Sequence, residues 1–275
     1  MLFPLEDSIA MPRILTIVAP TRNSGKTTAA INLAASLAIL DQKTLLMDCD
    51  PAQGVWRGAS LLAPTGNSGG FYGVMTDRSS LEDALMTTSL PGLDMLPAGA
   101  DFSRADFLFE NTDGDIFKLR DMIFRKTAAY DYVIINGPPP EMPGLLASVL
   151  ISSPYLMIPL RAEAAAPSEL LPWLSGMKSL FSEMAAQEKQ WDLSARILGI
   201  LVNRSRSQEE GPESPEVPIP VLENLREFVF KTRIPESQAL AEGFSLGKPA
   251  AVYRISSRGA AAFMDLAEEV MGKFG

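Results

Sequence analysis

The sequence predicts an α/β protein in which helices cover both faces of a mostly parallel central sheet. Short apolar segments alternate along the chain with longer segments whose apolar residues recur at helical spacing. The short segments are apolar almost throughout, which is typical of parallel strands buried on both faces. This alternation indicates one domain with three layers, α/β/α.

Local patterns place the elements along the chain. The first strand is expected at residues 14–19, a β-branched apolar run that ends at Pro20 and a polar turn, and the first helix ends near residue 40, before the polar residues 41–43. The same alternation predicts strands at residues 44–47, 93–96, 132–135, 155–159 and 197–202, and helices at residues 116–127, 144–151, 168–184 and 260–270.

Two segments lack these patterns. Residues 1–12 show no periodicity and are expected to form a disordered leader, so that the domain spans residues 13–275. Residues 205–220 are rich in Ser, Glu and Pro, which predicts a mobile surface loop. The N-terminal segment has no basic region before an apolar stretch, and no apolar run approaches the ~18 residues of a membrane span, so we expect a cytoplasmic protein.

Composition excludes several kinds of chemistry. The 275 residues include no histidine and one cysteine, Cys49, so catalytic triads with histidine, intramolecular disulfides and Cys/His zinc sites are excluded. The formal net charge of −9 opposes unspecific adhesion to nucleic acid or anionic lipid. The chemistry must therefore come from carboxylates, lysine, backbone amides or a hard cation such as Mg²⁺.

A phosphate-binding loop is predicted directly after the first strand, at residues 20–28 (PTRNSGKTT). A strand, a tight turn, Gly-Lys-Thr and a helix follow one another, which is the context that such a loop requires. Backbone amides at the turn and at the helix N-terminus favour an anion, and Gly25 allows its close approach. We predict that the phosphates are bound by Arg22, Asn23, Ser24, Gly25, Lys26, Thr27 and Thr28.

Two side chains of this loop carry specific expectations. Lys26 should place a positive charge on the β and γ phosphates of ATP, or on the β phosphate of ADP, and act in catalysis, and the Thr27 hydroxyl should bind Mg²⁺. The full GxxxxGK[ST] pattern is incomplete, because Pro20 stands at its first glycine. The alternative is a chance Gly-Lys-Thr tripeptide at the start of a helix.

Asp48 and Asp50 follow the second predicted strand, at the same edge of the sheet as this loop. Ligands of open α/β sheets lie at the carboxyl ends of the strands, so two carboxylates there suit work on Mg²⁺ and water. Their alternative is a solvated acidic turn before Pro51.

Four ordered segments resemble the ParA/MinD group of deviant P-loop ATPases, and more specifically its ParA/Soj branch. They are PTRNSGKTTAAINLAASLA, KTLLMDCDPAQG, AAYDYVIINGPPP and KTRIPESQALAEGFSLGKPAAVYRISSRGAAAFMDLAEEVM, and their order and spacing match from Arg13 to the end of the chain. The resemblance implies a P-loop NTPase fold. It also implies that Asp50 orients the attacking water as the catalytic aspartate of switch I, that Asp48 lies near Mg²⁺, that residues 137–140 form switch II and that Asn203 holds the adenine base.

Two positions depart from the family's pattern at the site. Thr21 stands where the family has a lysine that reaches across the dimer, and the neighbouring Arg22 is either a substitute for it in trans or a solvent-facing arginine. Asn136 replaces the Walker B aspartate that holds Mg²⁺. An amide keeps an oxygen acceptor but loses the charge, so we expect weaker Mg²⁺ binding and slower hydrolysis.

The C-terminal segment also departs from the pattern. Glu236 and Ala239 stand where Soj-like proteins have arginines that bind DNA unspecifically, which weakens the expectation of DNA binding. Basic residues remain nearby, either as a thin DNA-binding patch or as scattered surface charges: Lys231, Arg233, Lys248, Arg254 and Arg258. The last predicted helix carries Asp265, Glu268 and Glu269 opposite its apolar residues, so it should pack on the sheet rather than bind a membrane.

The resemblance implies a switch that binds ATP, hydrolyses it slowly, forms a nucleotide-dependent homodimer and positions or partitions a chromosome, plasmid or protein assembly through a cargo or adaptor protein. Thr21 and Asn136 support an alternative, a nucleotide-binding scaffold or regulator with little hydrolysis. A cellulose-synthesis accessory ATPase and a bacterial tyrosine kinase domain are further alternatives, although such kinases end in a tyrosine cluster and the last tyrosine here is Tyr253.

Overall fold

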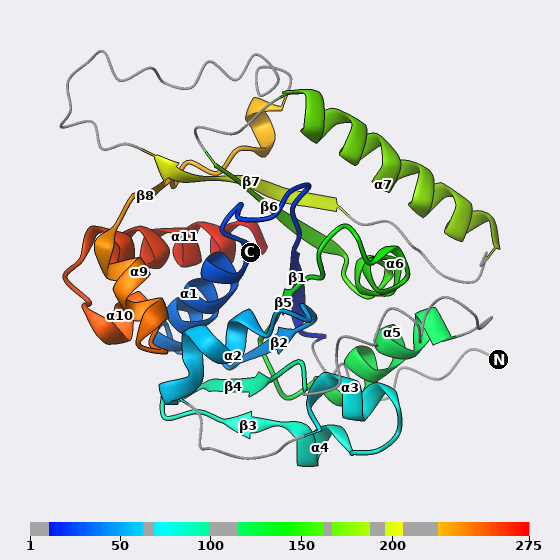
Figure 1. Ribbon diagram of the computed structural model, residues 1–275, viewed down its shortest axis with the longest axis horizontal. Helices are drawn as coiled ribbons and strands as arrows, with labels where there is room; N and C mark the ends of the chain where they lie inside the picture. The colour runs from blue at the N-terminus through cyan, green and yellow to red at the C-terminus, as the bar shows by residue number, and fades with distance from the viewer. Residues whose placement is uncertain are drawn as a thin grey trace.

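An eight-stranded sheet forms the centre of the molecule in the computed structural model (Figure 1). The structure describes residues 11–62, 69–99, 115–161, 167–187, 196–205 and 225–274. The strands are β1 (Arg13–Ile17), β2 (Thr44–Asp48), β3 (Met86–Thr87), β4 (Leu93–Leu96), β5 (Tyr132–Asn136), β6 (Tyr155–Arg161), β7 (Arg196–Ser205) and β8 (Ile234–Pro235). Their order in the sheet is β3-β4-β2-β5-β1-β6-β7-β8, and all pairs are parallel except β3 with β4.

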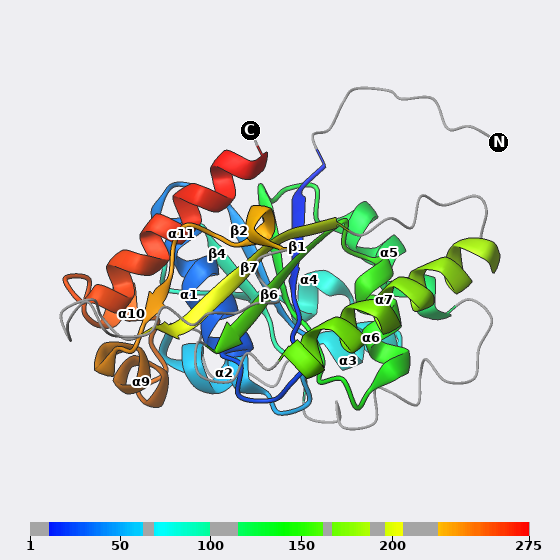
Figure 2. The same ribbon diagram turned by 90° about the horizontal axis from the view of Figure 1, so that it is seen from above.

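Helices lie on both sides of this sheet. They are α1 (Lys26–Ile39), α2 (Gly54–Ala59), α3 (Gly70–Met75), α4 (Leu81–Ala84), α5 (Asp115–Lys126), α6 (Pro143–Ile151), α7 (Pro167–Gln187), α9 (Gln238–Ser245), α10 (Ala250–Tyr253) and α11 (Arg258–Phe274). Figures 1 and 2 place α1 and α11 on one face, and α5, α6 and α7 on the other. The predicted α/β class with a mostly parallel sheet is confirmed.

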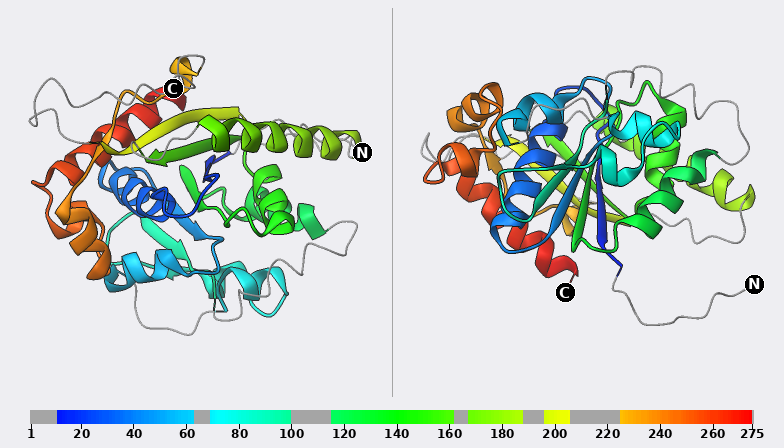
Figure 3. Two further views of the ribbon diagram at one scale, coloured as in Figure 1. Left: turned by 45° about the horizontal axis from the view of Figure 1, so that its top comes forward. Right: turned by 90° about the horizontal axis from the view of Figure 1, so that it is seen from below.

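The central strands are buried on both faces, because successive side chains of a strand point to opposite sides. In β5, Ile134 packs into the apolar cluster formed with α1 and α11, while its neighbours Val133 and Ile135 join the cluster formed with α3, α5 and α6. Because the side chains on both faces of these strands are buried, both sets of residues are apolar, and the strands show no apolar–polar alternation. Figure 3 shows the two helical layers with the strands between them.

The long elements match the sequence-based prediction to within a few residues. The predicted strand 14–19 is shorter, Arg13–Ile17, because the chain turns into the loop beyond it, and the predicted helix 168–184 extends over Pro167–Gln187. The short elements were not predicted: β3, β8, α2, α3, α4, α9 and α10. The missed strands have only two residues and the missed helices four to eight, about two turns or fewer, so a period cannot be recognised in them.

Two predicted segments lie largely or wholly outside the described residues. They are the leader 1–12, of which only Met11 and Pro12 are described, and the loop 205–220, of which only Ser205 is described.

The last helix packs inside the fold. Phe263, Leu266 and Val270 of α11 belong to the same buried cluster as α1, and the Phe274 ring lies 4.7 Å from the Tyr155 ring, centroid to centroid. Ala262 also lies on the buried face of α11, whereas the neighbouring Ala261 is exposed. Among the described segments, no helix has the length and apolar character that crossing a bilayer requires.

Strand order decides which chain segments meet at the carboxyl edge. Since β5 lies between β1 and β2, Asn136 at its end is in register with both Ile17 and Asp48. The phosphate loop that follows β1 therefore faces the ends of β2 and β5.

Candidate functional site

The loop between β1 and α1 has the backbone geometry of an anion cradle. Asn23 and Gly25 both adopt left-handed conformations, with φ of 60° and 93°, and α1 begins at the next residue, Lys26. Among the described residues, no acceptor pairs with the backbone N–H groups of residues 24–27. Unpaired amides at a helix N-terminus favour a bound anion, and so do neighbouring residues that alternate between right- and left-handed conformations.

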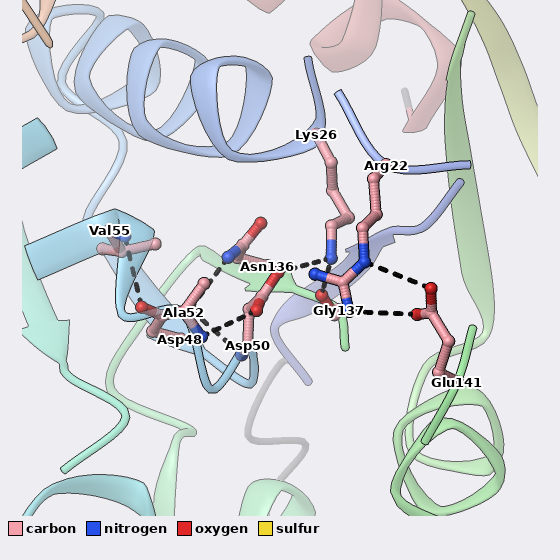
Figure 4. Close-up of polar contacts among 9 residues, drawn as sticks. All are labelled: Arg22, Lys26, Asp48, Asp50, Ala52, Val55, Asn136, Gly137 and Glu141. Atoms are coloured by element: carbon pink, nitrogen blue, oxygen red, sulfur yellow. Dashed lines mark hydrogen bonds and ion pairs between the residues drawn. The ribbon is translucent and has the colours of Figure 1, made fainter. Parts of the chain in front are cut away.

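Lys26 connects this loop to the ends of two other strands (Figure 4). Its Nζ forms an ion pair with Asp50 at 2.9 Å, and it also donates a hydrogen bond to the carbonyl oxygen of Gly137. Both side chains of the ion pair are about one-eighth exposed, at 12%. One ammonium group thus joins the phosphate loop, the loop after β2 and the loop after β5.

Asp48 and Asn136 lie side by side at the ends of β2 and β5. Asn136 donates from Nδ2 to Asp48 Oδ1 at 2.8 Å, and Asp48 also accepts from the backbone N–H groups of Asp50 and Val55, each at 3.2 Å. Asp48 is fully buried, and burial raises its pKa from 3.8 to about 7 despite these three hydrogen bonds. The carboxylate that was predicted to face Mg²⁺ is therefore a desolvated group held by donors.

The donors at this edge fit a magnesium ion. Asn136 Oδ1 is buried and accepts no hydrogen bond from any described residue, so this hard oxygen could serve as a metal ligand. Thr27, in the first turn of α1, lies against the start of α2, since a Cβ on Gly54 would come within 3.2 Å of Thr27 Oγ1. Mg²⁺ takes few protein ligands and completes its shell with water and phosphate oxygens. Among the described residues, no cluster of three acidic, His or Cys side chains is placed to hold a metal ion.

Arg22 pairs with Glu141, which lies two residues before the start of α6. Its Nε and one terminal nitrogen donate to the two carboxylate oxygens of Glu141 at 3.1 and 3.4 Å. Both side chains are more than half exposed, at 63% and 57%, so the pair is accessible at the rim of the site (Figure 4). The sequence analysis did not identify Glu141, whose only local signal is an acidic residue after three prolines.

The segment after β5, predicted to be switch II, packs tightly against β1. The Gly137 N–H donates to the Ile17 carbonyl at 3.0 Å, and a Cβ on Gly137 would lie 2.8 Å from a Val18 methyl group. Glycine is required by this close approach. The role of the Gly137 carbonyl as a Lys26 partner also escaped the sequence analysis, because backbone acceptors leave no residue-type signal.

Asn203, at the β7 edge, reaches the phosphate loop from the side. It is 8% exposed, and its Nδ2 donates to the backbone carbonyl of Ser24 at 3.0 Å. Sequence resemblance implied a contact with adenine, and the structure adds this contact with the loop. The remaining predicted loop residue, Thr28, lies in the first turn of α1, where its carbonyl accepts from Asn32 Nδ2 at 2.9 Å.

The C-terminal segment carries a less basic surface than its sequence suggests. Arg254 is paired with Glu242 at 3.6 Å, and Glu236 is exposed. Ala239 is only 3% exposed, so this position of α9 faces the core, and an arginine there would need a different packing.

A loop that joins a central parallel strand to a helix, with a lysine facing the carboxylates of the next strand's end, defines the class of P-loop nucleotide-binding proteins. Comparison with known proteins supports this class and narrows it. The family model described as AAA domain matches residues 13–189. The chain belongs to this family and, with it, to the ParA/MinD P-loop ATPases.

Individual relatives cover nearly the whole chain. The chromosome partitioning protein ParA of Myxococcus xanthus is 30% identical over 263 residues, covering 94% of this chain and 88% of its own. The sporulation initiation inhibitor protein Soj of Bacillus subtilis is 28% identical over 264 residues, covering 94% of this chain and 98% of its own. The structure of the septum site-determining protein MinD of Pyrococcus horikoshii, complexed with Mg-ADP, superposes with a TM-score of 0.72 at 25% identity, covering 96% and 98% of the two chains.

Proposed function

We propose that this protein is a nucleotide-dependent switch that binds ATP or ADP with Mg²⁺ and positions or partitions a cargo. The observation that carries the proposal is the position of Lys26, whose Nζ contacts Asp50 and the Gly137 carbonyl at the head of the phosphate loop. A triphosphate bound in the loop would compete for the same ammonium group. Its arrival would therefore change the contacts of both segments, which is how a γ-phosphate controls switch loops.

Different residues of the site would bind the phosphates, the metal ion and the attacking water. The unpaired amides of residues 24–27 and Lys26 would bind phosphates, while Thr27, Asp48 and the free Asn136 oxygen would hold Mg²⁺, which neutralises phosphate charge when bound. Asp50, released from Lys26, would orient water for slow hydrolysis. Asn136 limits the rate, because an amide supplies no negative charge to the metal.

The functions given in the relatives' names support a role in partitioning. ParA of Myxococcus xanthus is a chromosome partitioning protein, and we infer a cytoplasmic protein that forms a nucleotide-dependent homodimer and works with a partner protein. These relatives favour partitioning over cellulose synthesis. Weak unspecific DNA binding through the remaining basic residues of the C-terminal segment belongs to the same proposal.

Titration calorimetry of Mg-ATP into the wild type and Lys26→Ala tests the nucleotide site. We expect binding by the wild type and no measurable binding by the variant, because Lys26 carries the only side-chain ammonium of the loop. Thr127→Val is a matched control, since it removes a buried side-chain hydrogen bond to the Ile123 carbonyl, remote from the loop. Equal affinities of the wild type and Lys26→Ala would refute the phosphate-loop assignment.

A second candidate function is a scaffold or regulator that holds nucleotide without useful turnover. The observation that favours it is the Asn136–Asp48 hydrogen bond. With an amide at position 136, this edge of the sheet has one buried carboxyl group, Asp48, whose pKa is about 7, whereas an aspartate at position 136 would give two carboxyl groups. Binding of ATP without detectable phosphate release, at every protein concentration, would support this candidate over the switch.

A further inference from the structure

We infer that Asn203 is a positioning residue that fixes the orientation of the Ser24–Gly25 peptide in the phosphate loop. This inference rests on the proposed nucleotide site and assigns a role that does not involve the base. The carrying observation is the hydrogen bond from Asn203 Nδ2 to the Ser24 carbonyl, 3.0 Å long and buried, between residues 179 positions apart.

Because the Ser24 carbonyl and the Gly25 N–H belong to the same peptide group, the Asn203 hydrogen bond also sets the direction of that N–H. The C=O and N–H of a trans peptide point in opposite directions, and the described residues contain no cis peptide. Holding the Ser24 oxygen on Asn203 therefore directs the Gly25 N–H away from Asn203. That N–H has no acceptor among the described residues, as expected of a group that binds an anion.

Gly25 makes such an anchor necessary. With φ of 93° and no Cβ, glycine lets the preceding peptide rotate between orientations at little cost. A Cβ at this position would clash with Asn203 Nδ2, so the close contact of Asn203 requires glycine here. Without the Asn203 hydrogen bond, one N–H of the cradle would lose its fixed direction.

The anchor itself is rigidly held. Asn203 belongs to β7, where it is in register with Arg161 of β6 and with Ile234 of β8. A donor on a strand that is paired on both sides moves less than one on a loop. The sheet therefore supports the phosphate loop from two strands: β1, which leads into it, and β7, which holds it from the side.

A base-free ligand separates this role from adenine recognition. Titration calorimetry with Mg-tripolyphosphate and with Mg-ATP is applied to the wild type, Asn203→Ala, the isosteric Asn203→Asp and the control Thr127→Val. Because both Asn203 variants lose the donor to Ser24, we expect each to bind both ligands about tenfold more weakly, and the control to match the wild type. A loss confined to ATP would overturn the proposal and assign Asn203 to the base.

Hydrogen exchange of the nucleotide-free protein gives a readout that needs no ligand. Peptides covering residues 20–30 should exchange faster in Asn203→Ala than in the wild type and Thr127→Val, with the melting temperatures compared to exclude global unfolding. Unchanged exchange would overturn the proposal. A wild type that binds neither ATP nor tripolyphosphate would refute the nucleotide site, while faster exchange in the variant would still support the anchor.

Discussion

Lys26 and Asp50 form an ion pair at 2.9 Å that joins the phosphate loop to the segment after β2. The lysine that we propose binds phosphate is thus paired with the carboxylate that we propose orients water. A phosphate bound in the loop would compete with Asp50 for the Lys26 ammonium group, so under the proposed function nucleotide binding would favour the release of Asp50.

Asp50→Asn should therefore tighten ATP binding while abolishing turnover. The amide competes less well for Lys26, so we expect affinity to rise about three- to tenfold, in line with the free energy of a partly exposed ion pair. Phosphate release should fall at least about 100-fold, because the proposed water-orienting carboxylate is gone. Calorimetry and a steady-state phosphate assay measure the two effects, and unchanged affinity would mean that the ion pair does not oppose binding.

Asn136→Asp should raise the rate of phosphate release. The substitution would place a negative charge beside the proposed Mg²⁺ position, but it would also replace the 2.8 Å Asn136–Asp48 hydrogen bond by a contact between two buried carboxyl groups. We therefore expect the nucleotide-free variant to lose about 1–3 kcal/mol of unfolding free energy at pH 8, and Mg-ATP to restore much of it.

A steady-state assay with saturating Mg-ATP measures the rate, and thermal unfolding with and without ligand measures the stability. If the rate stays at the wild-type level, the limitation lies elsewhere, and Thr21→Lys becomes the variant to examine.

Arg22→Ala tests whether this arginine acts across a dimer. Because the Arg22–Glu141 pair is exposed on both sides, its loss should change the unfolding free energy by less than about 0.5 kcal/mol. If Arg22 works in trans, phosphate release by the variant should fall at least about tenfold.

Mixing variants separates an action in trans from one within the protomer. If Arg22 acts in trans, Arg22→Ala should still bind nucleotide in its own site but should not supply the arginine, whereas Lys26→Ala keeps the arginine but lacks the proposed phosphate-binding lysine. Their mixture should release phosphate faster than either variant alone. The absence of recovery, with both proteins folded, would confine Arg22 to its own site.

The stability of the metal-free protein should fall as pH rises through the range set by Asp48. The folded pKa is about 7 and the ordinary value is 3.8, so between them the folded state keeps a proton that the unfolded state has released. The contribution of Asp48 to the free energy of unfolding is therefore fully present below about pH 4, decreases as pH rises, and is lost above about pH 7. The total loss is at most about 4 kcal/mol.

Urea unfolding of the wild type and Asp48→Asn at several pH values between 5 and 8, without Mg²⁺ or nucleotide, isolates this contribution. The wild type should lose stability relative to the variant as pH rises. A constant difference between the two proteins would show that Asp48 titrates at an ordinary pKa.

Sequence patterns by themselves determined the α/β class, the long strands and helices, and the phosphate loop with Lys26 and the carboxylates Asp48 and Asp50. These features are local, since a period of apolar residues or a Gly-Lys-Thr turn before a helix is complete within one short segment. The resemblance added Asn136 and Asn203 as site positions but could not say what they touch.

Only the tertiary structure decided which of these groups meet. The order β2-β5-β1 sets Asp48 beside Asn136, and the place of β7 at one side of β6 brings Asn203 to the Ser24 carbonyl. The Lys26–Gly137 and Arg22–Glu141 contacts join residues more than 100 positions apart. Such contacts depend on strand order and burial, which are properties of the whole packed chain, and no local pattern of residues encodes them.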